Sequence, residues 1–405
     1  MTTGYVRRLR SGYSTLWTVQ NPRLAHLDIE LTERCNLNCI HCYINQPAGD
    51  RSVQASEMKT GQVKIILREA CELGALSVRF TGGEPLLRTD FAELYLFARQ
   101  MGLSVSLFTN GTLLSPELAD LFAHVPPRVK IEITIYGMTP ENYKAVTGVQ
   151  GGFSAAQRGI DLLREYRVPF LVKGVYLPPN RREIDAFEDW AASLSISDVP
   201  PGIVSSLNLR GRRDSAEKNK QIKALRPTAH ESLRILTRES ARYYEDMEQF
   251  CGRFMGPPGD KLFRCGAGRR ISVDAYGKVQ PCMLLRDPQL AYDLNEHGTS
   301  TASSSNRHPS LQDALLNFFP QLSGMRGINS DYLARCARCF LHGLCGQCPA
   351  KSWMEHGTLD TPVEYECSLA HVQARELGLL SEDEKGWEIP NWRQRLEGLR
   401  ARATN

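Results

Sequence analysis

The sequence lacks any long apolar run, and no stretch approaches the ~18 residues that suggest a membrane span. Its start, MTTGYVRRLR, lacks the apolar core of a signal peptide. Charge of neither sign dominates, because 49 basic and 45 acidic residues leave a net charge of +4. That balance requires neither nucleic acid nor an anionic membrane as a partner. We therefore expect a cytoplasmic protein with no nucleic-acid or membrane partner.

Disordered and collagen-like compositions are also excluded, because 42% of the residues are apolar and 23% are charged. A length of 405 residues predicts two to three domains, at roughly 150 residues per domain. Cysteine, in contrast, is abundant, with twelve residues concentrated near the N-terminus and in the C-terminal third. A reducing cytosol disfavours disulfides, so clustered thiols indicate metal ligands.

The region from residue 24 to about residue 210 alternates short β-rich runs with helical patterns, as parallel strands joined by crossover helices do. The sequence predicts six strands, at 24–32, 77–83, 104–111, 130–137, 169–177 and 202–210. Helical spacing appears between the first two strands, at Val63, Ile66, Leu67 and Ala70, and in segments 90–102, 115–125, 153–166 and 182–195.

Strand polarity distinguishes a barrel from a flat, doubly wound sheet. In the fourth strand Ile131, Ile133 and Ile135 share one side, whereas Glu132 and Thr134 lie on the other. Helices that cover the apolar faces while polar faces line a lumen describe a partly closed barrel. We therefore predict an α/β fold, a partial (β/α)6 TIM-type barrel with a C-terminal cysteine-rich domain.

The pattern changes along the chain divide it into five parts. We expect an N-terminal extension at 1–23, the barrel at 24–211, a bridging helical segment at 212–264, the cysteine-rich domain at 265–370 and a helical tail at 371–405. The cysteine-rich part has Gly and Pro turns but few periodic segments, so bound ligands would have to hold it together.

Cys35, Cys39 and Cys42 form a C-x3-C-x2-C loop directly after the first strand, at the strand end where barrels place their sites. Structural zinc takes four ligands, and His41 could supply the fourth, so a closed zinc site is one interpretation. An iron-sulfur cluster with only three cysteines would leave one iron open to a chelating small molecule.

This placement resembles the radical S-adenosylmethionine (SAM) superfamily. The resemblance implies a [4Fe-4S] cluster on Cys35, Cys39 and Cys42, whose fourth iron binds the amino and carboxylate groups of SAM. It also implies that SAM is cleaved reductively to a 5′-deoxyadenosyl radical. His41 is in a position where the family commonly has an aromatic residue near the adenine.

Other SAM contacts follow from the same resemblance. Gly82, Gly83 and Glu84, followed by proline, match the Gly-Gly-Glu-Pro motif of the family at the end of the second strand. The two glycines allow a close backbone approach, and the carboxylate could accept hydrogen bonds from the ammonium group of SAM. Asn110 and Thr134 are similar to positions that line the SAM pocket.

The C-terminal cysteines exceed one four-ligand site, and C-x2-C pairs suit zinc as well as iron, so zinc ribbons are an alternative. Their pattern resembles the SPASM domain, which binds two auxiliary iron-sulfur clusters. The resemblance implies one cluster on Cys336, Cys339, Cys345 and Cys367, and another on Cys265, Cys282 and Cys348. Cys251 is a candidate fourth ligand for the second set, which otherwise has an open iron.

SPASM enzymes mostly modify peptides or proteins, so ribosomal-peptide maturation by cross-link formation or side-chain oxidation is the leading hypothesis. Its partners would be a peptide or protein substrate and a one-electron reductant such as flavodoxin or ferredoxin. The short segment before the first strand predicts that leader recognition, if needed, uses a separate protein. The sequence identifies no general base.

Three alternatives stay open at this point. The first is an enzyme that modifies tetrapyrrole side chains in haem or haem d1 synthesis. The second is an anaerobic sulfatase-type maturase, which is disfavoured because Met283 stands where those enzymes carry an acidic residue. The third is a zinc-binding scaffold without enzymatic activity.

Overall fold

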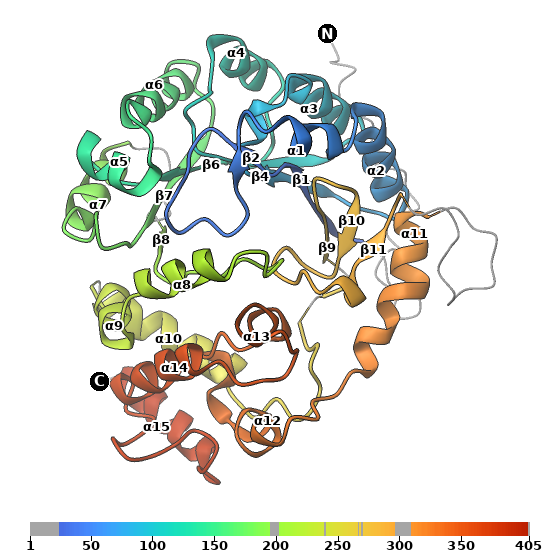
Figure 1. The fold of residues 1–405 in the computed structure, drawn as a ribbon. Coiled ribbons are helices and arrows are strands. Elements are labelled where there is room, and N and C mark those ends of the chain that lie inside the picture. The colour runs from blue at the N-terminus through green and yellow to red at the C-terminus, as the bar shows by residue number, and fades with distance from the viewer. Residues whose placement is uncertain are drawn as a thin grey trace.

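The computed structural model describes residues 24–194, 202–238, 240–265, 267–268, 270–295 and 309–403. The predicted extension at 1–23 lies outside these residues. A nine-stranded sheet runs in the order β11-β10-β9-β1-β4-β5-β6-β7-β8 (Figure 1). Its six parallel strands from β1 to β8 match the six predicted ones, namely β1 (His26–Thr32), β4 (Ser77–Gly82), β5 (Ser104–Thr109), β6 (Ile131–Ile135), β7 (Phe170–Val175) and β8 (Gly202–Val204).

Helices connect these strands and lie on one side of the sheet (Figure 1). Local signals fix their ends, since α4 and α5 each begin with a proline behind a capping Ser115 or Thr139. The helices of this half are α1 (Arg51–Ser56), α2 (Thr60–Glu72), α3 (Phe91–Gln100), α4 (Pro116–His124), α5 (Pro140–Thr147), α6 (Gly152–Glu165) and α7 (Ile184–Ser193). Of these, α1 and α5 were not predicted.

The two faces of the sheet differ in polarity as the sequence predicts. Along β6 the three isoleucines are buried, whereas Glu132 and Thr134 are half-buried on the opposite face. The isoleucines belong to one large apolar core that also includes Val63 and Leu67 of α2. The predicted partial barrel is confirmed, and its sheet does not close among the described residues.

The sheet extends beyond the predicted barrel. Strand β9 (Arg270–Val273) pairs in parallel with β1, and β10 (Lys278–Gln280) and β11 (Tyr292–Asp293) follow in antiparallel register. Ile271 and Val273 are fully buried in the same core as the barrel strands. The sequence predicted no strand in this segment, which it assigned to the cysteine-rich domain. In the structure the strands of this segment extend the barrel sheet beside β1.

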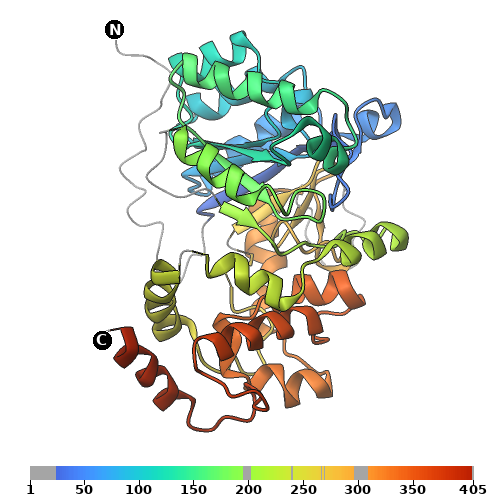
Figure 2. The same ribbon diagram turned by 90° about the vertical axis from the view of Figure 1, so that its left-hand side faces the viewer.

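The remaining helices mostly form a second body on the other side of the sheet (Figures 1 and 2), whereas α11 lies at the edge of the sheet and contacts α2. They comprise α8 (Ala216–Leu225), α9 (Ala229–Leu236), α10 (Ser240–Phe254), α11 (Leu311–Asp313), α12 (Ser330–Ala334), α13 (Pro349–His356), α14 (Glu364–Glu376) and α15 (Trp392–Ala403). A separate apolar cluster that includes Phe340, Ala370 and Leu396 joins α14 and α15. Within the described ranges, no helix is long and apolar enough to cross a membrane.

Candidate active site

The loop that carries the first three cysteines is anchored at both ends and in the middle. At its start, β2 (Arg34–Cys35) pairs with β3 (Gln46–Pro47). The backbone amides of Asn38 and Ile40 donate to the last two carbonyls of α5, over N···O distances of 2.8 and 2.9 Å. These contacts hold the loop over the carboxyl end of the sheet, because they join the loop to α5, the helix that follows β6.

The thiols of Cys35, Cys39 and Cys42 lie close enough to interact electrostatically. Burial, with smaller contributions from Glu84 and Cys42, raises the pKa of Cys35 to about 12. Burial likewise raises the pKa of Cys39, and the neighbouring thiols of Cys42 and Cys35 add to this rise. Burial favours the protonated form of these thiols, and coordination to a metal centre would stabilise the thiolate form.

The Gly-Gly-Glu segment at the end of β4 packs against the stem of this loop. A Cβ on Gly82, whose φ is +135°, would meet the Thr32 carbonyl oxygen at 2.0 Å, and one on Gly83 would meet the Arg34 carbonyl oxygen at 2.2 Å. The Gly83 amide donates to Thr32 at 2.7 Å. The glycines therefore allow β4 to lie directly against the backbone that leads into Cys35.

Glu84 links this segment to the end of β5. Its carboxylate is fully buried and accepts hydrogen bonds from the Leu86 amide, the Thr109 hydroxyl at 2.8 Å and the Asn110 amide at 2.8 Å. The Asn110 side chain in turn lies 3.8 Å from the Cys35 sulfur. The residues of the second predicted motif thus position the first cysteine.

Burial gives Glu84 a titration that can be measured. Burial raises the pKa of Glu84 from 4.5 to about 7, against hydrogen bonds that lower it. The folded protein therefore holds the proton more tightly than the unfolded chain, so this carboxyl should reduce stability as the pH rises from 4.5 to about 7. We expect the thermal midpoint of the wild type, relative to Glu84→Gln, to fall between pH 6 and pH 8.

The matched control for this titration is Glu93→Gln, because the Glu93 carboxylate is 57% exposed on the helical surface. This variant should change the thermal midpoint only slightly, because the side chain is exposed. Anaerobic calorimetry at the two pH values measures both differences. Equal pH dependence of the wild type and Glu84→Gln would contradict the buried titration.

Two further predicted SAM contacts are His41, which lies in the cysteine loop itself, and Thr134, which lies on β6. Burial, followed by the charge of Lys218, lowers the pKa of His41 to about 4, so its ring is neutral. Nδ1 of His41 is buried without a hydrogen-bond partner among the described residues, and its ring lies 5.7 Å from that of Tyr136. Thr134 is half-buried on the polar face of β6 and pairs in register with Lys173 of β7.

Two residues that the sequence did not single out contact the loop. The Tyr136 hydroxyl forms a hydrogen bond with Cys39, and Nζ of Lys218 donates to the Cys39 carbonyl at 3.1 Å. Apolar and polar residues alternate along 131–136, which places Tyr136 on the same face as Glu132 and Thr134. This alternation was the signal that could have identified Tyr136. Lys218 comes from α8, 179 residues away, where no local pattern marks it.

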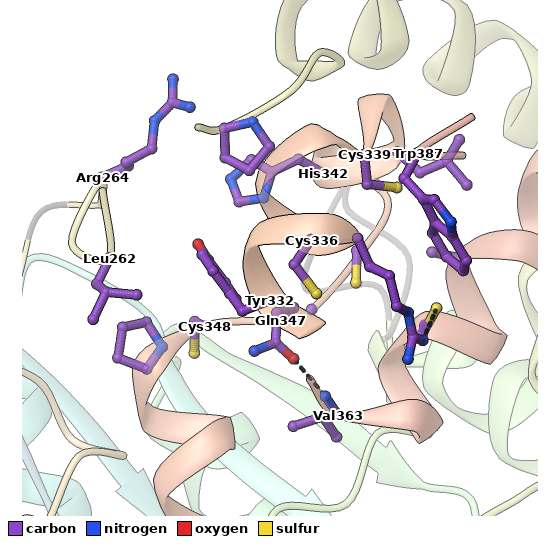
Figure 3. Close-up of a pocket in the computed structure, with 18 of the residues that line it drawn as sticks. Leu262, Arg264, Tyr332, Cys336, Cys339, His342, Gln347, Cys348, Val363 and Trp387 are labelled. Carbon is purple, nitrogen blue, oxygen red and sulfur yellow. Dashed lines mark hydrogen bonds between the residues drawn. The ribbon is translucent and has the colours of Figure 1, made fainter. Parts of the chain in front are cut away.

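Most of the C-terminal cysteines surround one cavity of about 360 Å³ (Figure 3). Tyr332, Gln347 and Trp387 also line it. Six cysteines contribute, and they are Cys265, Cys336, Cys339, Cys345, Cys348 and Cys367. No disulfide joins any of the twelve cysteines of the chain, all of which lie in the described ranges.

Electrostatic contacts divide these thiols into two groups. Burial raises the pKa of Cys282, and the neighbouring Cys348 and Cys265 raise it further. Burial also raises the pKa of Cys345, with further contributions from Cys367 and Cys339. Cys336 belongs with the latter group, because Cys367 and Cys339 act on it in the same way. The two groups coincide with the two ligand sets that the resemblance implies.

Cys251 stays apart from the Cys265 group. It is fully buried on α10, within the cluster that joins Phe340 and Leu396, and burial alone raises the pKa of its thiol. The structure therefore offers no support for Cys251 as the fourth ligand of that group.

All three groups consist of thiols, the donors that iron-sulfur clusters take from proteins. In the described part of the chain, no three His, Cys, Asp or Glu side chains are arranged to hold a metal ion. A four-iron cluster takes one thiolate per iron, so its thiols lie farther apart than the ligands of one ion. The three groups of neighbouring, buried thiols fit such clusters by their chemistry.

A parallel partial barrel with a three-thiol loop at the end of its first strand defines a class of enzymes, and the comparisons with known proteins agree. The radical SAM superfamily matches residues 29–191. A probable GTP 3′,8-cyclase from Methanocella arvoryzae is 30% identical over 65% of this chain and 83% of its own length. The chain therefore belongs to the radical SAM superfamily and is a radical SAM enzyme, and this family implies a [4Fe-4S] cluster that binds SAM.

Two further relatives differ in how much they cover. An AdoMet-dependent heme synthase from Methanosarcina barkeri is 35% identical, but the match covers 38% of this chain and 43% of that protein. The mycofactocin maturase MftC from Mycobacterium tuberculosis is 27% identical over 85% of this chain and 83% of its own length. Only the second match extends well beyond the barrel.

Solved structures show the same fold over nearly the whole chain. The structure described as native anSMEcpe with bound AdoMet has a TM-score of 0.60 at 16% identity, covering 93% of this chain and all of that one. Streptococcus suis SuiB bound to its precursor peptide SuiA has a TM-score of 0.57 at 16% identity, covering 84% of this chain and 74% of that one. These structures confirm the predicted fold, a partial barrel followed by a C-terminal body.

Proposed function

We propose that this protein is a peptide maturase, which cleaves SAM reductively and abstracts hydrogen from a ribosomally made peptide to form a cross-link or oxidise a side chain. The observation that carries the proposal is the pairing of the Cys35 loop with two further thiol groups in the C-terminal body. The similarity to the mycofactocin maturase supports it, because that match covers 85% of the chain.

In this proposal Cys35, Cys39 and Cys42 hold the [4Fe-4S] cluster. When bound, the cluster supplies the electron that splits SAM into methionine and a 5′-deoxyadenosyl radical. Glu84 and Asn110 keep Cys35 in place through the hydrogen bonds described above. The neutral His41 ring, near Tyr136, offers an uncharged surface for the adenine.

Gly82, Gly83 and Thr134 complete the proposed SAM pocket in different ways. The glycines hold the end of β4 against the cysteine-loop stem, so their backbone groups lie beside the cluster. Thr134 presents a hydroxyl from the polar face of β6. Glu84 orders these groups through three hydrogen bonds within the protein, and its Oε2, which accepts only one of them, could also accept from the ammonium group of SAM.

The C-terminal thiols would hold two auxiliary iron-sulfur clusters. Cys336, Cys339, Cys345 and Cys367 form one complete ligand set, whereas Cys265, Cys282 and Cys348 provide three ligands. Such clusters supply an acceptor for the electron left on an oxidised product, which favours net oxidation of the substrate. A small electron carrier such as flavodoxin or ferredoxin would reduce the enzyme, and a separate protein would recognise the leader of the peptide.

An auxiliary ligand can be tested separately from SAM chemistry. Cys336→Ala removes a thiol of the complete auxiliary set, far along the chain from the Cys35 loop. We expect this variant to retain SAM cleavage while it loses product formation. Chromatography of 5′-deoxyadenosine and mass spectrometry of the peptide measure the two activities. Equal loss of both would contradict a separate auxiliary role.

Modification of a tetrapyrrole is the second candidate, because the heme synthase shares 35% identity with part of this chain. Co-expression with a candidate precursor peptide, followed by mass spectrometry, separates the two. The peptide proposal predicts a mass loss in multiples of two hydrogens. A modified tetrapyrrole and an unchanged peptide would favour the second candidate. Metal analysis excludes a zinc scaffold if it finds about twelve irons per chain and little zinc.

A further inference from the structure

The polar face of the sheet carries a row of side chains that the proposed SAM chemistry does not use. Asp28 of β1, Arg79 of β4, Phe108 of β5, Glu132 of β6 and Lys173 of β7 contribute to it. The Arg79 and Lys173 side chains remain 29% and 35% exposed, so a ligand can reach both cations.

One aromatic ring lies between the two cations. The guanidinium carbon of Arg79 lies 4.5 Å from the centroid of Phe108, and Nζ of Lys173 lies 5.1 Å from it. Each cation also has one carboxylate partner, since Nη1 of Arg79 donates to Asp28 at 2.8 Å and Lys173 is paired with Glu132. The cations approach from strands on either side of β5.

Arg79 has donors left over. A guanidinium carries five N–H donors, and Nη1 is shared between Asp28 and the Met283 sulfur, which lies 3.5 Å away. Nε of Arg79 is buried and has no hydrogen-bond partner among the described residues. A ligand with an acceptor oxygen can reach donors only on the exposed part of this side chain, which is 29% exposed.

The row lies between the two ends of the proposed chemistry. Arg79 precedes Gly82 by three residues on β4, and Lys173 pairs in register with Thr134. On the other side, Arg79 contacts Met283, which directly follows the thiol of Cys282. A substrate held at this row would therefore lie between the SAM pocket and an auxiliary thiol group.

We propose that Arg79 and Lys173 bind a carboxylate of the peptide substrate over Phe108, either the C-terminal carboxylate or that of an Asp or Glu side chain. This inference rests on the proposed peptide substrate. Because Asp28 and Glu132 already offset the two cations, a substrate carboxylate would gain from the remaining N–H donors of Arg79 and Lys173, and its single charge meets less repulsion than a triphosphate does. A triphosphate would meet repulsion from Asp28 and Glu132, which disfavours a nucleotide.

Equilibrium dialysis of the reconstituted full-length enzyme with SAM tests the binding directly. The probes are acetyl-Ala-Phe with a free carboxylate, acetyl-Glu-Phe-amide, and acetyl-Ala-Phe-amide, which has no charge. At least one acidic probe should bind about tenfold tighter than the neutral one, since charge-assisted hydrogen bonds are worth that much. The acidic probe that binds identifies the source of the carboxylate.

Variants of the row make the test specific. Arg79→Gln and Lys173→Gln should bring the acidic probe to the affinity of the neutral one. Glu132→Gln should tighten binding, because it frees Lys173, and a misfolded protein cannot produce this gain. Lys64→Gln, which removes a cation paired with Glu93 on the helical side, is the matched control and should bind as the wild type does.

Three results would overturn the proposal. They are equal affinity for acidic and neutral probes, no binding of any probe, and tighter binding of GTP than of the acidic peptides. None of these measurements requires SAM cleavage. The inference can therefore fail while cleavage, and its dependence on Cys35, remain intact.

Discussion

Alanine at Cys35, Cys39 or Cys42 should abolish the formation of 5′-deoxyadenosine from SAM. Each substitution removes one of three thiolates that hold the proposed cluster, and two thiolates cannot keep a four-iron cluster with an open iron in place. Total iron should fall by about four atoms per chain while the auxiliary clusters remain. Chromatography of the SAM products and iron analysis of the anaerobically reconstituted variants measure both effects.

Cys71→Ala is the matched control for these variants. Cys71 is a buried cysteine on α2, and its sulfur lies 3.9 Å from the Met101 carbonyl, on the helical side of the sheet. This variant should retain full iron content and SAM cleavage, although its loss of buried volume lowers the thermal midpoint slightly. Full SAM turnover after any of the three loop substitutions would refute the cluster assignment.

Arg286→Met should cause a large loss of stability. Arg286 is 3% exposed and pairs with Glu30, which is fully buried on β1, and with Asp274 at 3.7 Å. Arg286 follows Cys282 by four residues, so this ion pair joins the cysteine-rich region to the first barrel strand. Removing one partner of a buried pair costs about 3–5 kcal/mol, because the other charge is left buried.

The loss should depend on pH in a predictable direction. Burial raises the pKa of Glu30 to about 7, and Arg286 opposes this rise. Without Arg286 the carboxyl takes up a proton more readily, so the deficit should be smaller at pH 6 than at pH 8. Anaerobic calorimetry of the thermal midpoint at both pH values measures this.

Two further variants separate the ion pair from general damage. Adding Glu30→Gln to Arg286→Met should restore part of the lost stability, since it removes the orphaned charge. Lys64→Met breaks the exposed pair with Glu93 and should cost only ~0–1 kcal/mol. A midpoint for Arg286→Met equal to that of Lys64→Met would show that the buried pair does not stabilise the fold.

The barrel could be predicted from the sequence because its strands carry a strong periodic signal. In β6 every second side chain is an isoleucine that faces the helices, so polarity alone fixed both the strand and its orientation. Strand β9 has only four residues, too few for such a signal. Its partner β1 lies more than two hundred residues earlier, so pairing could not be inferred from local sequence.

The cysteine loop was equally predictable in position, but its supports were not. The two glycines predicted a close backbone approach to a ligand, and the structure shows that they also allow close packing against Thr32 and Arg34. Lys218 reaches Cys39 from a helix in the predicted bridging segment. Contacts of this kind depend on tertiary packing, which brings distant segments together without leaving a motif in either.

Electron paramagnetic resonance of a variant with alanine at Cys265, Cys282, Cys336 and Cys339, which leaves at most two thiols in each auxiliary set, addresses the N-terminal site alone. After anaerobic reconstitution and reduction with dithionite, the account predicts one reduced cluster signal that changes when SAM is added. A signal that does not change when SAM is added would contradict the assignment of a SAM-binding cluster. So would a protein that holds no iron at Cys35, Cys39 and Cys42.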